Sequence, residues 1–298
     1  MRIAITGSTG LIGTALSRHL SDGGHTVVPV VRRDPTDGAI GWDPTAGRLD
    51  PADLTGIDAV VHLAGAGIGD RRWTDEYKRT LMDSRVDGTR LIASTLADLG
   101  GDGPQVFLSG SAIGFYGERG DEELDEASAA GSGFLAEICE RWEEATAPAE
   151  AAGVRVAHLR TGIVLTPIGG ALKKMLPLFK LGAGGRFGNG RQWMSWISLT
   201  DEIRAIEHLL SSNLSGPVNL TAPAPVRNAE FAKTLGKVLG RPSLLPVPSF
   251  GPKLLLGSEL ADALLFDGQR VLPSALRGDG FEFSHGDLAT ALRAELGR

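Results

Sequence analysis

Three glycines near the start of the chain, Gly7, Gly10 and Gly13, have the spacing of a phosphate-binding turn. A short apolar run at 3–6 precedes them and an amphipathic run at 11–22 follows, which places the turn between a strand and a helix. In such a turn, backbone N–H groups approach a pyrophosphate, the helix N-terminus adds partial positive charge, and a Cβ would block the approach. The motif predicts dinucleotide binding, and the alternative is an ordinary turn without a ligand. The predicted contacts are Gly7, Thr9, Gly10, Leu11, Ile12 and Gly13.

A pair of arginines, Arg32 and Arg33, follows the second apolar run at 26–31. At this place in dinucleotide folds, an acidic residue binds the ribose 2′-OH of NAD, whereas an arginine accommodates the 2′-phosphate of NADP. The planar guanidinium suits a phosphate because it can donate two parallel hydrogen bonds. The pair therefore favours NADP. The neighbouring Asp34 keeps NAD as the less favoured cofactor, and a basic surface turn is the other interpretation.

Small and polar residues follow two later strand-like runs, and parallel strands would bring their carboxyl ends to one edge of a sheet. The run at 58–63 leads into small residues on which a flat cofactor can lie. The predicted cofactor contacts there are Leu63, Ala64 and Gly65. Ser109 and Ser111 end the run at 105–110, where they could hydrogen-bond a substrate oxygen or cap the strand.

Two further arginines are candidate ligand contacts. Arg160 ends a buried run at 154–159, where a charge needs a partner that an anionic ligand would supply. Arg85 stands just before an apolar helical run and could reach the phosphates or ribose of a cofactor, or form an ordinary salt bridge on a helix. Trp193 and Trp196, in or beside a glycine-rich segment, either form an aromatic wall for a ring or belong to the local core.

The bulk composition narrows the class of protein. A chain of 298 residues with 42% hydrophobic content can bury a large core, and a net charge of −6 gives nucleic-acid binding no support. No apolar run approaches the length of a membrane span, so we expect no transmembrane helix. The chain starts directly on a strand, so we expect no signal peptide. The six histidines are scattered without metal-ligand spacing, so metal binding has no support. The lone Cys139 excludes an intrachain disulfide. We expect a cytoplasmic protein with a small-molecule substrate, without nucleic acid, membrane or metal, and of open oligomeric state.

Strand-like and helix-like runs alternate through the first two thirds of the chain. The predicted strands are 3–6, 26–31, 58–63, 105–110, 154–159 and 218–220, and the predicted helices are 11–22, 74–98, 132–152, about 170–181 and 193–210. This order predicts an α/β fold with a doubly wound parallel sheet, the NAD(P)-binding Rossmann fold. Residues 1–165 would form the dinucleotide-binding domain, with 193–222 returning to it. Residues 166–192 and 223–298 would form a smaller C-terminal α/β substrate lid.

Taken together, the motifs resemble the extended short-chain dehydrogenase/reductase superfamily. The matching stretches are 6–13, 62–65, 85–89, 109–111 with 115–117, and 196–197 with Asp201. A narrower resemblance, carried by 134–139, 160–165 and 188–197, is to the atypical NAD-dependent epimerase/dehydratase family, also labelled sugar nucleotide epimerase-like. The tail at 241–290 is similar to that family's C-terminal domain of unknown function. The resemblance implies a nucleotide-binding Rossmann fold and leaves the substrate open.

The usual proton relay of that superfamily is missing. It consists of a Tyr and a Lys four residues later on one helix, where the Lys and the cofactor lower the pKa of the phenol. The chain has two tyrosines, Tyr77 and Tyr116, and the residues four positions later are Leu81 and Gly120. Another group must then move the proton in any reaction. The candidate catalytic residues are Ser109, Ser111, Tyr116 and Glu137.

Two functions of different class follow from these observations. The first is an NADP-dependent oxidoreductase or epimerase that acts on a small polar or sugar-nucleotide-like substrate. The second is a non-catalytic, NADP-sensing regulatory protein, linked through the resemblance to cell division. The missing Tyr and Lys favour the second function, and the well-formed glycine turn with a substrate-like region favours the first.

The glycine turn yields a direct test. We predict that Gly10→Val abolishes cofactor binding and leaves the fold largely intact, because the added side chain occupies the space that the pyrophosphate needs. Calorimetric titration with NADP⁺ and a circular-dichroism spectrum of the same sample measure the two effects. A folded variant that still binds the cofactor would show that this turn is not the phosphate cradle.

Overall fold

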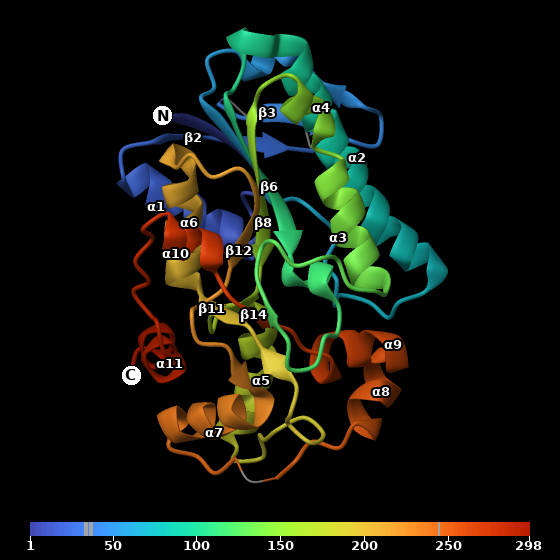
Figure 1. Ribbon diagram of the computed structural model, residues 1–298, viewed down its shortest axis with the longest axis vertical. Helices are drawn as coiled ribbons and strands as arrows, with labels where there is room; N and C mark the ends of the chain where they lie inside the picture. Colours follow the sequence, from blue (N-terminus) through green and yellow to red (C-terminus); the bar gives the residue numbers. More distant parts are fainter. Residues whose placement is uncertain (33–34, 36–37, 244) are drawn as a thin grey trace.

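The computed structural model describes residues 1–298 apart from 33, 34, 36, 37 and 244. Its centre is an eight-stranded sheet in the order β12-β8-β6-β5-β1-β2-β3-β4 (Figure 1). The strands are β1 (Arg2–Thr6), β2 (Thr26–Val31), β3 (Ile40–Asp43), β4 (Arg48–Leu49), β5 (Ala59–His62), β6 (Val106–Ala112), β8 (Arg155–Thr161) and β12 (Gly216–Leu220). All neighbours pair in parallel except β3 and β4. The order reverses beside β1, so the predicted doubly wound sheet is confirmed.

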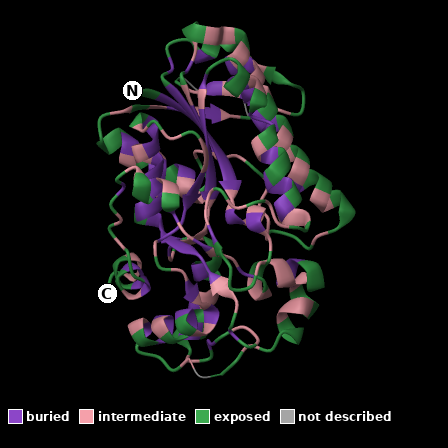
Figure 2. Ribbon diagram, in the orientation of Figure 1, coloured by how far each residue is buried: buried purple, intermediate pink, exposed green. Residues whose placement is uncertain are grey.

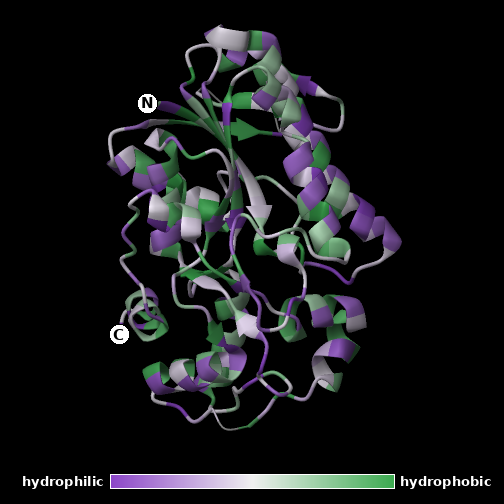
Figure 3. Cartoon of the chain, in the orientation of Figure 1, coloured by the Kyte–Doolittle hydropathy of each residue, from purple (hydrophilic) through white to green (hydrophobic). Residues whose placement is uncertain are grey.

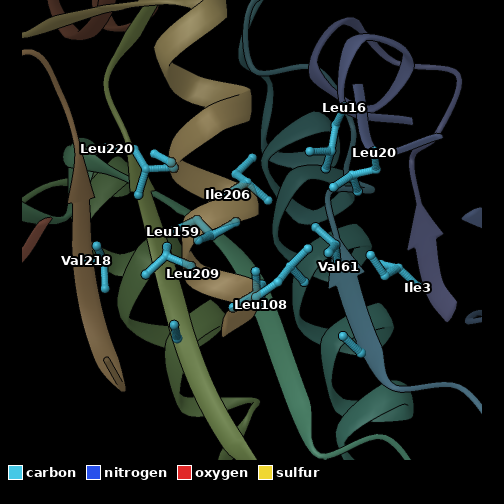
Figure 4. Packing of buried hydrophobic residues seen from close by; sticks show 14 of the residues in the cluster. Ile3, Leu16, Leu20, Val61, Leu108, Leu159, Ile206, Leu209, Val218 and Leu220 are labelled. Carbon is cyan, nitrogen blue, oxygen red and sulfur yellow. The ribbon is translucent and has the colours of Figure 1, made fainter. Parts of the chain in front are cut away.

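Helices cover both faces of this sheet. Those on one face are α1 (Leu11–Asp22) and α6 (Leu199–Ser211), and those on the other are α2 (Asp75–Leu99), α3 (Phe134–Glu144) and α4 (Ala147–Ala151). Figure 4 shows Leu16 and Ile206 of the first layer against Val61 and Leu108 of the strands. The strands are buried along most of their length (Figure 2), as expected for a parallel sheet that is covered on both sides.

A smaller layered region lies below the carboxyl ends of the strands in Figure 1. It contains α5 (Gly170–Lys180), α7 (Asn228–Leu239), α8 (Phe250–Leu256), α9 (Ser258–Ala261), α11 (Leu288–Leu296), β7 (Glu123–Leu124), β9 (Ile163–Leu165), β10 (Trp193–Met194), β11 (Trp196–Ser198), β13 (Val226–Arg227) and β14 (Arg270–Val271). The short helix α10 (Ser274–Gly278) lies outside this region, beside α6 and β12, and its Leu276 joins the core of the large sheet. Its own core packs Leu172, Trp196, Phe231 and Leu292 together. Apolar residues gather in this core and in the central strands (Figure 3).

Three segments differ from the sequence prediction. Residues 193–198 form β10 and β11 and not a helix, because α6 begins only after Ser198, whose hydroxyl accepts a hydrogen bond from the Asp201 N–H at 3.0 Å. The predicted helix at 132–152 is two helices, and the second has Pro148 in its first turn. The strands β3 and β4 were missed because their alternating residues lie in a short segment between turns.

In the described part of the chain, no helix combines the length and the apolar character needed to cross a bilayer.

One carboxyl group is fully enclosed between α6 and the end of β8. The Glu202 side chain accepts a hydrogen bond from the Thr161 hydroxyl at 2.9 Å, and its other oxygen, Oε2, has no partner among the described residues. Burial raises the pKa of Glu202 to about 8, so the carboxyl is protonated at neutral pH.

This burial predicts a loss of stability as the pH rises. Between the ordinary pKa of 4.5 and the folded value of about 8, the folded chain binds more protons at Glu202 than the unfolded chain does. The free energy of unfolding therefore falls across this window by up to about 1.4 kcal/mol per pH unit. In urea titrations at pH 5 and pH 8, Glu202→Gln should lose less stability than the wild type, and Glu230→Gln, at an exposed position, should behave like the wild type. Equal pH dependence in both variants would contradict the assignment.

Candidate functional site

The glycine turn is packed so closely that side chains are excluded at two of its three positions. A Cβ at Gly13 would lie 2.1 Å from the carbonyl oxygen of Gly7, and a Cβ at Gly7 would lie 2.9 Å from the backbone after β5. Gly7 also has a φ of +66°, in the left-handed region that favours glycine. At Gly10, a Cβ would lie 3.1 Å from the same carbonyl, which accepts the Gly10 N–H at 2.9 Å. The turn therefore brings bare backbone to the N-terminus of α1.

A buried hydrogen-bond cluster fixes the opposite wall of the turn. The Thr6 hydroxyl accepts the N–H groups of Leu63 and Ala64 at 3.1 and 3.2 Å, and it lies 2.7 Å from Nδ1 of His62. Its own proton therefore points to Nδ1, which assigns the ring proton of His62 to Nε2. Burial, together with the charge of Arg85, lowers the pKa of His62 to about 3. His62 is a neutral, packed strand-end residue that orients the backbone.

These elements enclose a cavity of about 750 Å³ at the carboxyl ends of β1, β2 and β5. Its walls are Gly7, Ser8, Thr9, Gly10, Val30, Val31, Arg32, Trp42, Leu63, Ala64 and Gly65. Predicted contacts from three separate segments thus meet in one place, and Arg32 is exposed on the rim. Trp42 was not predicted as a contact, because the strand that carries it was not predicted from the sequence. Arg33 lies outside the described residues.

Three predicted contacts in the first turn of α1 do not line this cavity. The Leu11 side chain instead lies against Gly169, where a Cβ would approach it to 2.6 Å. Ile12 packs against the core under the sheet, and Gly13 makes room for the carbonyl of Gly7. In this structure the three residues pack the helix against its neighbours, and contact with a ligand stays a prediction.

Arg85 is a buried cation that has no anionic partner among the described residues. Its guanidinium donates to the Leu81 carbonyl at 3.1 Å and lies 5.0 Å from the ring centre of Trp142. It forms no ion pair with any residue that the structure describes. Burial disfavours the charged form of Arg85 and lowers its pKa. A Cβ at Gly65 would lie 3.4 Å from its Cζ, so Arg85 stands just behind the wall of the 750 Å³ cavity. An anionic or hydroxyl-bearing ligand would satisfy its free N–H groups.

Arg85 also lines a second cavity, of about 190 Å³, between the eight-stranded sheet and the smaller region. Its walls include Ile68, Ala112, Ile113, Gly114, Leu135, Ile138, Cys139, Trp142, Gly162, Ile163, Trp193, Ser195, Ala263, Leu264, Asp267, Gly268 and Gln269. Leu135 and Cys139 have the four-residue spacing of the missing Tyr and Lys. Burial raises the pKa of the Cys139 thiol to about 12, so the thiol stays neutral.

Arg160 finds its anionic partner inside the protein. Its Nε and Nη2 donate to the two carboxylate oxygens of Glu143, both at 2.8 Å, and both side chains are largely buried. Ser111 donates to the same carboxylate at 2.6 Å. The Tyr116 hydroxyl accepts from Arg160 at 3.0 Å and donates to the side-chain oxygen of Asn219 at 2.7 Å. The expected ligand anion for Arg160 is therefore replaced by Glu143, a pairing that no local sequence signal could reveal.

None of the four predicted catalytic residues lines the 190 Å³ cavity. Tyr116 is fully enclosed, both of its hydrogen bonds are used, and burial raises its pKa. Ser111 is bound to Glu143, and Ser109 is fully buried in β6. Glu137 is exposed on α3. Their catalytic roles stay predictions to which this geometry adds no contact.

The cavity wall supplies a carboxylate that the sequence did not single out. Asp267 follows the last turn after α9, and its N–H donates to the Asp262 carbonyl at 2.8 Å. Partial burial and the nearby carboxylates of Glu118 and Asp262 raise its pKa, against the opposite effect of Lys253. Of the two tryptophans, Trp193 lines this cavity and Trp196 is fully buried in the core of the smaller region.

Comparison with known proteins agrees with this geometry. Residues 3–220 match the NAD dependent epimerase/dehydratase family, and residues 247–295 match a domain of unknown function, DUF1731. The chain is 48% identical to epimerase family protein MT2273 of Mycobacterium tuberculosis, over 97% of this chain and 96% of that protein. It is 35% identical to human epimerase family protein SDR39U1, over 98% of this chain and 99% of the human one.

Solved structures show the same architecture. Human SDR39U1 (isoform 2), crystallised with NADPH, superposes with a TM-score of 0.88 at 33% identity, covering 100% of this chain and 99% of the human chain. A nucleoside-diphosphate sugar epimerase from Corynebacterium glutamicum gives a TM-score of 0.80 at 40% identity, covering 100% of this chain and 58% of that one. The glycine turn, the doubly wound sheet and the family match lead to one conclusion: the chain belongs to the NAD dependent epimerase/dehydratase family.

Proposed function

We propose that the chain binds NADP(H) and uses it for hydride transfer with a small substrate, as an oxidoreductase or epimerase that works without a Tyr–Lys pair. The observation that carries the proposal is the 750 Å³ cavity, which has the bare glycine turn on one wall and Arg32 on its rim. An anionic pyrophosphate suits the backbone N–H groups at the start of α1, and a 2′-phosphate suits the guanidinium of Arg32. The NADPH in the structure of the human relative supports the same choice of cofactor.

The chain's own residues divide the work of binding. The Gly7–Gly10 backbone would hold the pyrophosphate, and the Thr6–His62 cluster keeps the backbone of Leu63 and Ala64 in place beside it. Arg85 would bind a phosphate or ribose oxygen where the large cavity approaches the small one. A bound cofactor would supply a hydride donor or acceptor at the small cavity, whose walls are mostly apolar.

Proton transfer needs a group on the wall of the small cavity. Among the described wall residues, Asp267 is the carboxylate, and its raised pKa brings its protonated form closer to neutral pH. The Cys139 thiol stays protonated, and the Arg85 guanidinium stays charged. Asp267 is therefore our choice for the proton donor and acceptor.

Cofactor preference is the first test of this function. We predict tighter binding of NADPH than of NADH in calorimetry. Arg32→Ala should weaken NADPH binding by roughly 1.5–3 kcal/mol, which is at least about tenfold, and leave NADH binding nearly unchanged. The matched control is Arg90→Ala, on the exposed face of α2. Equal affinity of the wild type for the two cofactors would overturn the assignment of NADP.

Proton transfer is the second test. In a screen of carbonyl compounds with NADPH, Asp267→Asn should lower turnover by roughly 10²–10⁴-fold without a change in NADPH affinity. Glu137→Gln and Tyr116→Phe, assayed beside it, test the two sequence-based candidates. If Glu137→Gln or Tyr116→Phe shows a comparable loss while Asp267→Asn stays fully active, Asp267 is not the residue that transfers the proton. Tight NADPH binding without turnover across the panel would favour the NADP-sensing alternative.

A further inference from the structure

The small cavity beside Arg85 has a size and a wall chemistry that select one class of substrate. We propose that it takes a compact, uncharged carbonyl compound about the size of one six-membered ring, and that it does not take a nucleotide sugar. This inference rests on the proposed NADP(H) function, because the carbonyl carbon would accept the hydride and the carbonyl oxygen one proton. The products are the alcohol and the oxidised cofactor, so atoms and electrons balance.

The volume limits the part of a ligand that can lie inside the cavity. The cavity measures about 190 Å³. A protein cavity of roughly 150 Å³ holds one benzene molecule, whereas drug-sized ligands occupy roughly 300–1,000 Å³. A ring with a carbonyl group fits this space, and a sugar joined to a nucleoside diphosphate does not.

Three contacts hold the wall on the side of the smaller region in this structure. A Cβ at Gly268 would lie 2.3 Å from the carbonyl oxygen of Trp193, which shows that the two backbones are in direct contact. The Gly268 N–H donates to the Glu118 carboxylate at 2.6 Å, and the Ser195 hydroxyl donates to the Gln269 carbonyl at 2.7 Å. Outward movement of this segment would break these contacts together.

The charges on the walls match a neutral molecule. Among the described wall residues, the charged side chains are Arg85 and Asp267, and most of the others are apolar. Arg85 binds the cofactor in the proposed function, which leaves no cation among these wall residues for an anionic substrate. A nucleoside diphosphate carries at least two negative charges and requires several cationic or N–H donors. Three basic residues of the glycine-rich segment at 166–192, Lys173, Arg186 and Arg191, are exposed and do not line this cavity.

Binding to the full chain saturated with NADP⁺ tests the substrate class without turnover. The probes are cyclohexanone, cyclohexanecarboxylate and UDP-glucose, titrated by ligand-observed NMR. We expect saturable binding of cyclohexanone with a Kd of about 1 mM, the order that seven non-hydrogen atoms can reach. Cyclohexanecarboxylate should bind at least about tenfold more weakly, because its charge adds to that of Asp267 and must be desolvated. UDP-glucose should not bind.

A cavity-filling variant locates the binding. Leu264 lines the cavity and is 40% exposed, so Leu264→Trp adds bulk at the wall where the fold tolerates it. It should weaken cyclohexanone binding at least tenfold, whereas Leu254→Trp, at a position 78% exposed on α8, should not. NADP⁺ affinity, measured on the same samples, should stay unchanged in both. If the wild type does not bind NADP⁺, the proposed cofactor function is refuted, and this result is distinct from a failure of the substrate class. The substrate class would be overturned if UDP-glucose bound saturably and Leu264→Trp abolished that binding. It would also be overturned if cyclohexanone did not bind, or if Leu264→Trp left cyclohexanone binding unchanged.

Discussion

The contact between the glycine turn and the end of β5 is the constraint on which the rest of the site depends. Gly7 lies so close to the backbone of Leu63 and Ala64, and Gly13 so close to Gly7, that no side chain fits between them. The Thr6 hydroxyl holds the facing strand end through two N–H groups and the ring of His62. Two strand ends and a helix N-terminus are thereby fixed around one cavity, with bare backbone on its wall.

Polar groups beyond this contact serve two different purposes. The bidentate pair of Arg160 and Glu143, with Ser111 and Tyr116 bound to it, satisfies its own charges and ties β6, β8 and α3 together. Arg85 lacks such a partner within the described chain, and it stands where the large cavity approaches the small one. A buried cation of this kind is costly in the free protein and favourable when an anionic ligand arrives. The guanidinium of Arg160 is therefore paired inside the protein, whereas that of Arg85 is the one that we propose for ligand binding.

Local patterns predicted the nucleotide-binding half well, because its strands, helices and glycine turn are each encoded within about ten residues. The doubly wound parallel sheet followed from the alternation of strands and helices. Contacts between distant segments could not be predicted in this way. Glu143 as the partner of Arg160, and Asp267 on a cavity wall with Arg85, join residues that only the folded chain brings together. The strand at 40–43 and the strands at 193–198 were missed because short segments carry too little periodicity.

The central claim is that the cavity beside the glycine turn is an NADP(H) site in which Arg32 binds the 2′-phosphate. A crystal structure of the full chain grown with NADPH tests it most directly. The claim predicts the pyrophosphate against the backbone of Gly7–Gly10 and the 2′-phosphate within hydrogen-bond distance of the Arg32 guanidinium. A dinucleotide bound in another cavity, or a 2′-phosphate turned away from Arg32, would contradict it.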